Sequence, residues 1–152
     1  MPAVYDKLGI RFLYPDNWTL DEQEALAGNR CISVYSPAGA FWSIALHAAN
    51  TDPGELASTA LATLKAEYEH SEAEEVSEQI GRQRLSGYDL NFFFLDLTNT
   101  ALIRGFRTAA ASCLVLCQAE DREFEQIAPV FRAITTSLFS EERDHPTCKT
   151  PG

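Results

Sequence analysis

Apolar and polar residues alternate over several short stretches of this chain, and such alternation predicts β-strands. One strand is expected over residues 9–14, where Ile10, Phe12 and Tyr14 share a face and Pro15 ends the run. The same pattern predicts strands that begin at Trp18 and that cover residues 31–35, 41–48 and 113–119. An exposed edge strand is expected to contain Val76, Ile80, Arg82 and Arg84.

The aromatic run over residues 88–97 is the centre of the predicted sheet. We expect Thr98 and Asn99 to form a two-residue turn, because asparagine tolerates a positive φ. Leu97 would then pair with Thr100, and Phe93 with Arg104. Since both faces of the run are apolar at its middle, the strand is expected to lie centrally, with cover on both sides.

Two segments have helical periodicity. In the first, Asp52 is the expected N-cap, Pro53 is the first helical residue, and the helix ends near Tyr68. A closing helix is expected from Asp121 onward, with apolar residues at helical spacing as far as Leu138. We therefore predict one domain over residues 1–139 and a flexible C-terminal tail over residues 140–152.

Composition limits the function. The chain has 152 residues, 45% of them hydrophobic, and a formal net charge of −10. A surplus of negative charge disfavours nucleic acids and anionic membranes as partners, because binding there depends on Lys and Arg, while basic partners remain possible. The sequence shows neither an export signal nor a run of apolar residues long enough for a membrane helix, so we expect a cytoplasmic protein.

The sequence offers little for catalysis. It has three histidines and four cysteines, and it lacks a nucleophile elbow, a phosphate loop and a dinucleotide fingerprint. His47 lies in an apolar strand and is expected to be a structural histidine. Reduced, packed cysteines are the simplest interpretation of Cys31 and Cys113. We predict no enzymatic activity, no cofactor and no metal site.

Arg104 is the most informative single residue, because an unpaired charge on an inner strand would be costly. It could contact an anion at the rim of a groove on the sheet, together with Arg107, or it could form an ion pair with an acid on a neighbouring element. The candidate ligand-binding residues are Arg104, Arg107 and Trp42.

The order of elements, with the pattern Phe12-x-Tyr14-Pro15-x-x-Trp18 and a closing helix that ends at Phe139, resembles the PsbP/Mog-like superfamily. This superfamily includes PsbP, the Ran-binding Mog proteins, DcrB-like proteins and the Eag chaperones of type VI effectors. The resemblance implies an α+β fold, a central antiparallel sheet of six to seven strands flanked by helices on both faces. It also implies a binding role and not a catalytic one.

The leading hypothesis is therefore a cytoplasmic, chaperone-like adaptor that binds a protein partner, with a homodimer as a further possibility. The alternative is a module that binds a small molecule or an anion in a sheet-side groove near Arg104.

Overall fold

A computed structural model describes the backbone of residues 1–68 and 70–149 and the side chains of residues 1–68 and 70–140. Over these residues the chain forms nine strands and three helices, in the order β1 (Ala3–Lys7), β2 (Ile10–Tyr14), β3 (Thr19–Asp21), α1 (Gln23–Leu26), β4 (Cys31–Tyr35), β5 (Phe41–His47), α2 (Pro53–Glu67), β6 (Glu72–Ile80), β7 (Gln83–Phe94), β8 (Leu97–Arg107), β9 (Ser112–Glu120) and α3 (Asp121–Lys149).

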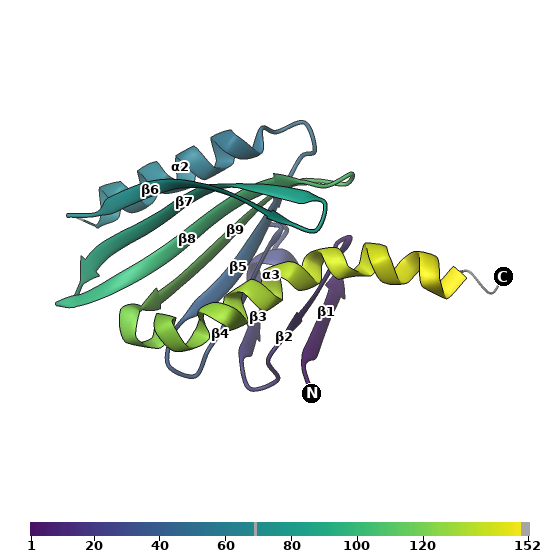
Figure 1. Ribbon diagram of the computed structural model, residues 1–152, viewed down its shortest axis with the longest axis horizontal. Helices are drawn as coiled ribbons and strands as arrows, with labels where there is room; N and C mark the ends of the chain where they lie inside the picture. Colours follow the sequence, from purple (N-terminus) through teal and green to yellow (C-terminus); the bar gives the residue numbers. More distant parts are fainter. Residues whose placement is uncertain (69, 150–152) are drawn as a thin grey trace.

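Seven strands form one antiparallel sheet in the order β3-β4-β5-β9-β8-β7-β6, and β1 and β2 form a separate hairpin. Figure 1 shows α3 crossing one face of this sheet and α2 lying on the other side. The predicted α+β fold, an antiparallel sheet with helices on both faces, is confirmed. Within the described residues, no helix combines the length and apolar character needed to cross a lipid bilayer.

The α3 side of the sheet holds the larger core. The Phe12 ring lies 4.8 Å from the Trp42 ring, and the Trp18 ring meets Phe131 of α3 edge-on. The backbone N–H of Leu13 donates to Ser137 Oγ at 2.8 Å and so ties β2 to α3. The β1–β2 hairpin and α3 therefore cover the same face together.

The other core lies beneath α2, where Ala57 and Leu64 pack on Leu90 of β7 and Ile103 of β8. The predicted N-cap is confirmed, because an Asp52 carboxylate oxygen accepts a hydrogen bond from the backbone N–H of Gly54. Burial of its apolar stripe holds α2 on this side of the sheet.

The predicted turn between β7 and β8 is wrong. The turn residues are Leu95 and Asp96, with φ values of 54° and 64°, and not Thr98 and Asn99. Phe93 pairs with Thr98, six positions before the expected Arg104. This shift is even, so each side chain keeps the face that the sequence predicted. The observed register sets Leu90 and Ile103 beneath α2, and this packing decides the pairing.

The expected central position of residues 88–97 is also only partly right. Their strand, β7, lies next to the edge strand β6, and its last residues, Phe93 and Phe94, are 58% and 48% exposed. The edge position of β6 is confirmed, but Arg82 and Arg84 do not belong to it. The chain turns at Gly81, where φ is +61°, and Arg84 lies in β7.

Two elements were not expected from the sequence. β1 has a single buried residue, Tyr5, and α1 has only four residues with none buried, so neither carries a clear apolar pattern. At the other end, α3 continues to Lys149, beyond Phe139, where we expected the domain to end. The side chains of residues 141–152 and the backbone of residues 150–152 lie outside the described part, and the flexible tail over residues 140–152 stays a prediction.

Candidate functional site

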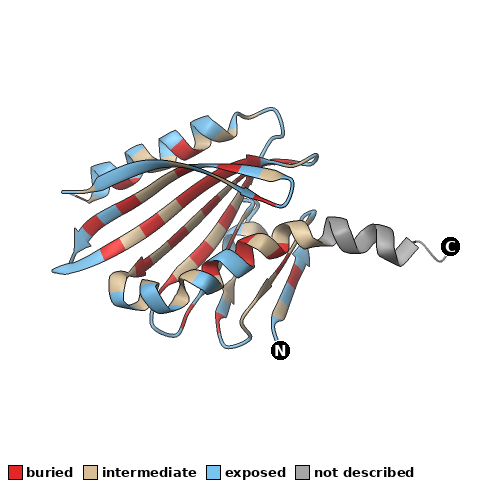
Figure 2. Cartoon of the chain, in the orientation of Figure 1, coloured by how far each residue is buried: buried red, intermediate tan, exposed pale blue. Residues whose placement is uncertain are grey.

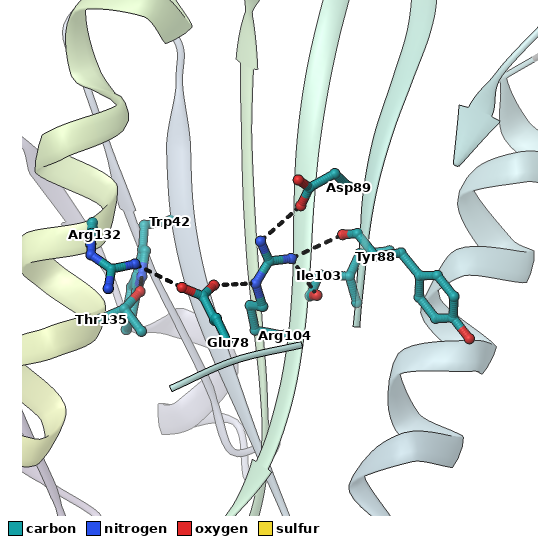
Figure 3. A network of polar contacts seen from close by, with 8 residues as sticks. All are labelled: Trp42, Glu78, Tyr88, Asp89, Ile103, Arg104, Arg132 and Thr135. Atoms are coloured by element: carbon teal, nitrogen blue, oxygen red, sulfur yellow. Dashed lines mark hydrogen bonds and ion pairs between the residues drawn. The ribbon is translucent and has the colours of Figure 1, made fainter. Parts of the chain in front are cut away.

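Arg104 of β8 is 8% exposed, and acceptors surround its guanidinium (Figure 3). Its Nε donates to Glu78 Oε2 at 2.5 Å, and its Nη2 lies 2.8 Å from Asp89 Oδ1. Its Nη1 donates to the backbone carbonyls of Tyr88 at 3.1 Å and Ile103 at 3.0 Å. The buried charge is thus paired with two acids and two carbonyls of its own chain.

Glu78 also joins this group to α3, because its Oε1 accepts a hydrogen bond from Arg132 Nη1 at 2.7 Å. Burial alone would raise the pKa of Glu78, but hydrogen bonds from Arg104 and Arg132 outweigh burial and hold the pKa below its ordinary value. Burial likewise disfavours the charged form of Arg104, yet Glu78 and Asp89 outweigh it and raise the pKa of the guanidinium. Both Glu78 and Arg104 are ionised at neutral pH, and they connect β6, β8 and α3.

This arrangement is poorly suited to binding an anion. The adjoining hollow of about 260 Å³ is lined by both Glu78 and Asp89, and two carboxylates would repel an incoming negative group. Most of the N–H groups of Arg104 already have acceptors. The contacts correspond to the ion-pair interpretation of Arg104. The anion-binding alternative would need free N–H donors on Arg104, and most of these donors are already used.

Arg107 lies at the end of β8 and three residues from Arg104, so the two side chains point to opposite faces of the sheet. Its Nε donates to the Ala49 carbonyl at 3.0 Å, and its Nη2 donates to the Thr51 carbonyl at 2.8 Å. Arg107 therefore fixes the loop that leads into α2, and the structure does not bring it together with Arg104.

Trp42, the third candidate, is a core residue with no exposed surface. Its indole Nε1 donates to Thr135 Oγ1 of α3 at 2.9 Å (Figure 3). Because its polar atom is paired and its ring is covered by Phe12, Trp42 has no surface to offer to a ligand.

The most unusual surface feature of the molecule was not predicted from the sequence. Phe93, Phe94, Leu95 and Leu97, which we call the apolar tip, are 58%, 48%, 78% and 42% exposed. Figure 2 shows the joined ends of β7 and β8 as exposed. The tip was missed because the aromatic run was expected to be covered. The signal that could have located it is Asp96, a residue that tolerates a left-handed turn position.

The apolar tip also projects beyond both neighbouring strands. The pairing of β6 with β7 stops at Asn91, and the pairing of β9 with β8 stops at Asn99. The pairs of β7 and β8 beyond those residues therefore stand alone at the end of the sheet. Behind them, the Tyr68 ring stacks on Phe92 at 4.1 Å and supports the base of the tip.

A second apolar feature lies between the β1–β2 hairpin and α3. This groove has a volume of about 560 Å³, and its walls include Leu13, Tyr14, Pro129, Val130 and Ala133. Among the described side chains, those of α3 that line the groove are uncharged, and Asp16 and Met1 with its N-terminus lie at its other side.

Within the described part of the chain, the histidine and cysteines that the sequence put forward for catalysis lie at different places on the sheet. His47 is exposed at the end of β5, and Cys113 lies on the opposite face of the sheet. Burial raises the pKa of the Cys113 thiol to about 11. Cys31 lies on the same face as His47, but burial, and then the charges of Glu24 and Asp21, raise the pKa of its thiol too. Among the described residues, no three His, Cys, Asp or Glu side chains are grouped to hold a metal ion.

No protein-family model matches this sequence, and no curated protein matches it. Solved structures do match its fold. The chain is similar to the cyanobacterial PsbP protein CyanoP from Synechocystis sp. PCC 6803, with a TM-score of 0.62, 12% identity and 90% of each chain covered. It is similar to the Ran-binding protein Mog1p of Saccharomyces cerevisiae, with a TM-score of 0.57, 9% identity, and 91% of this chain and 93% of Mog1p covered.

A third similar structure is PA94 of Pseudomonas aeruginosa, a protein of unknown function described as a putative regulator. Its TM-score is 0.55 and its identity 13%, over 90% of this chain and 95% of PA94. At such low identities these likenesses concern the fold. The chain has the PsbP/Mog-like fold that the sequence resemblance implied.

Proposed function

We propose that this chain, which has the PsbP/Mog-like fold, is a non-enzymatic, chaperone-like adaptor that binds another protein through the apolar tip. The proposal includes a cytoplasmic location and the absence of a cofactor. The fold is shared with Mog1p, whose name describes it as Ran-binding, and this supports a binding role without identifying the partner.

The observation that carries the proposal is the conformation of Leu95. It occupies the first turn position between β7 and β8 with φ at +54°, where Asn, Asp or Gly is favoured, and 78% of it is exposed. A left-handed backbone costs a bulky residue about 1 kcal/mol, and this leucine gains little from burial in return. We infer that the Leu95 side chain binds a partner protein. Burial of this side chain in the partner surface would then offset the cost of its strained backbone.

The shape of the apolar tip favours a protein partner over a small molecule. Small-molecule sites are concave and enclose their ligand, whereas the tip is the projecting end of two paired strands. Exposed Phe93 and Phe94 add aromatic area of the kind that dominates protein interfaces. Arg104, the centre of the small-molecule alternative, is already paired with Glu78 and Asp89.

The test compares three forms of the protein in affinity capture followed by mass spectrometry. The tip variant carries Phe93→Ser and Leu95→Ser, which leave Phe94 in contact with Tyr68. The control carries Leu26→Ser, which alters a leucine of α1 that is 77% exposed. We expect one protein to be enriched by the wild type and the control, and recovery with the tip variant to fall by about tenfold or more, as for loss of a hot-spot residue.

Circular dichroism and thermal unfolding establish that the tip variant is folded. Equal capture by all three forms would contradict the proposal. So would the absence of any enriched protein while a small molecule co-purifies with the chain.

A further inference from the structure

The edge strand β6 borders the apolar tip, and its outer side is open in the described part of the chain. Among the described strands, β6 pairs with β7 alone and ends the strand order of the sheet. In an antiparallel pair, alternate residues direct their N–H and C=O groups away from the partner strand. Such an edge can accept one more strand through main-chain hydrogen bonds.

The charge of β6 limits what that strand can be. Its nine residues, Glu72–Ile80, include four glutamates and neither Lys nor Arg. Glu78 is paired with Arg104 and Arg132, but Glu72, Glu74 and Glu75 are exposed and form no ion pair among the described residues. Two copies of β6 paired edge to edge would bring glutamates close to glutamates, which is unfavourable. A basic strand would meet opposite charge on both faces.

A hollow of about 380 Å³ lies where β6 begins, beside the apolar tip. The residues that line it include Phe93, Glu72, Asp121 and His70, and an Asp121 carboxylate oxygen accepts a hydrogen bond from the Thr100 hydroxyl at 2.7 Å. An aromatic ring beside two carboxylates suits a guanidinium or an ammonium group, which the ring attracts through its face and the acids through their charge.

We propose that β6 binds an extended basic segment of the partner protein by strand addition, with a Lys or Arg side chain of that segment in the hollow beside Phe93. This inference rests on the proposed function and specifies its partner. The apolar tip then contacts the same partner immediately beyond the start of β6, where the added strand continues past Glu72.

The experiment uses a synthetic peptide as long as β6, with lysine and valine in alternation, and measures its Kd by fluorescence anisotropy. One comparison peptide has the same charge but a central proline, which prevents continuous strand pairing. A second has glutamate in place of lysine. The binding variant carries Glu72→Gln, Glu74→Gln and Glu75→Gln, and the control carries Asp6→Asn, Glu24→Gln and Glu125→Gln, exposed acids outside β6. Both variants lose three negative charges.

We expect the basic peptide to bind the wild type and the control within about twofold, and the β6 variant about tenfold more weakly, because each exposed ion pair changes Kd by a few-fold. The proline and glutamate peptides should bind at least about tenfold more weakly. Hydrogen exchange should show new protection of backbone amides within β6 when the basic peptide is bound.

Equal weakening by both variants would overturn the inference, since it would indicate attraction by net charge alone. Equal binding of the proline peptide would exclude strand addition. A dimer in sedimentation that becomes stronger in the β6 variant than in the wild type would assign this edge to a second copy, because the variant removes the repulsion between facing glutamates. If a tip-dependent partner is captured but the basic peptide does not bind, the inference fails and the adaptor function stands.

Discussion

Arg104 shows how one charged residue can occupy the interior side of a sheet. A charge held away from water without a partner costs several kcal/mol, so neighbouring strands must supply opposite charge. Here β6 supplies Glu78 and β7 supplies Asp89, while Arg132 of α3 shares Glu78. The Glu78 carboxylate joins β6 to β8 and α3, and Arg104 adds Asp89 of β7, which makes Glu78 the residue on which the link to α3 depends.

The change Glu78→Gln should lower the free energy of unfolding by about 2 kcal/mol, because it removes charged hydrogen bonds from two arginines. The matched change Glu75→Gln, on the same strand but without an ion-pair partner in the described residues, should alter it by less than about 0.5 kcal/mol. Urea unfolding followed by circular dichroism measures both values. Equal effects of the two changes would show that the ion pair of Glu78 adds no stability.

The difference in free energy of unfolding between the wild type and Glu78→Gln should depend on pH, because the pKa of Glu78 is lowered in the folded chain. Its contribution is complete above the ordinary glutamate value of about 4.3 and is lost as the pH falls through the lower folded value. The gap between wild type and Glu78→Gln should therefore be full at neutral pH and close in acid.

Sequence reasoning identified Arg104 as a buried charge that needs a partner, because its neighbours in the strand are apolar. It could not name Glu78 or Asp89, since both assignments depend on the register of β6, β7 and β8. Trp42 and Arg107 were selected by residue type, and the structure gives each a packing or loop-fixing role. Strand register thus limits how well a site can be predicted from residue types.

At the scale of elements, the clearest predictions came from strong local signals. Pro53 after Asp52 located α2, and alternation located β4 over Cys31–Tyr35. The β7–β8 turn was missed because Asn99 is the better turn residue, whereas the chain turns at Leu95 and Asp96. Asn99 is buried in β8, where its Nδ2 donates to the Leu97 carbonyl. Tertiary packing beneath α2 outweighed local turn preference here.

Replacing the turn with the favoured residues, Leu95→Asn and Asp96→Gly, should therefore stabilise the chain. We expect the free energy of unfolding to rise by about 1 kcal/mol, because both positions have positive φ and Leu95 loses little buried surface. The same variant should capture less of the partner, since it removes an apolar side chain from the tip. Unfolding in urea and affinity capture test the two effects, and a loss of stability would show that Leu95 is not strained.

At the scale of the whole molecule, the net charge of −10 is concentrated in part along one strand, where Glu72, Glu74 and Glu75 lie close together. Like charges at this spacing repel, and the repulsion is strongest at low salt, where the Debye length is long. Charge along an edge strand discourages edge-to-edge aggregation, and here the exposed charges of Glu72, Glu74 and Glu75 are all of one sign. Their presence is consistent with a surface kept negative for binding.

The β6 variant, with glutamine at positions 72, 74 and 75, should therefore unfold at a higher temperature than the wild type at low salt. We expect a gain of roughly 2–4 °C, the equivalent of about 1 kcal/mol for a chain of this size. In about 0.5 M NaCl the Debye length falls to roughly 4 Å and the gap should close. The control variant at positions 6, 24 and 125 should gain less, because its charges are dispersed.

The two properties of the β6 variant must be considered together. If it is more stable than the wild type and yet binds the basic peptide more weakly, its loss of binding does not come from unfolding, and the glutamates reduce stability in exchange for partner recognition. Lower stability of the β6 variant at low salt would mean that these carboxylates support the fold. Their role in binding would then have to be measured under conditions where both forms remain folded.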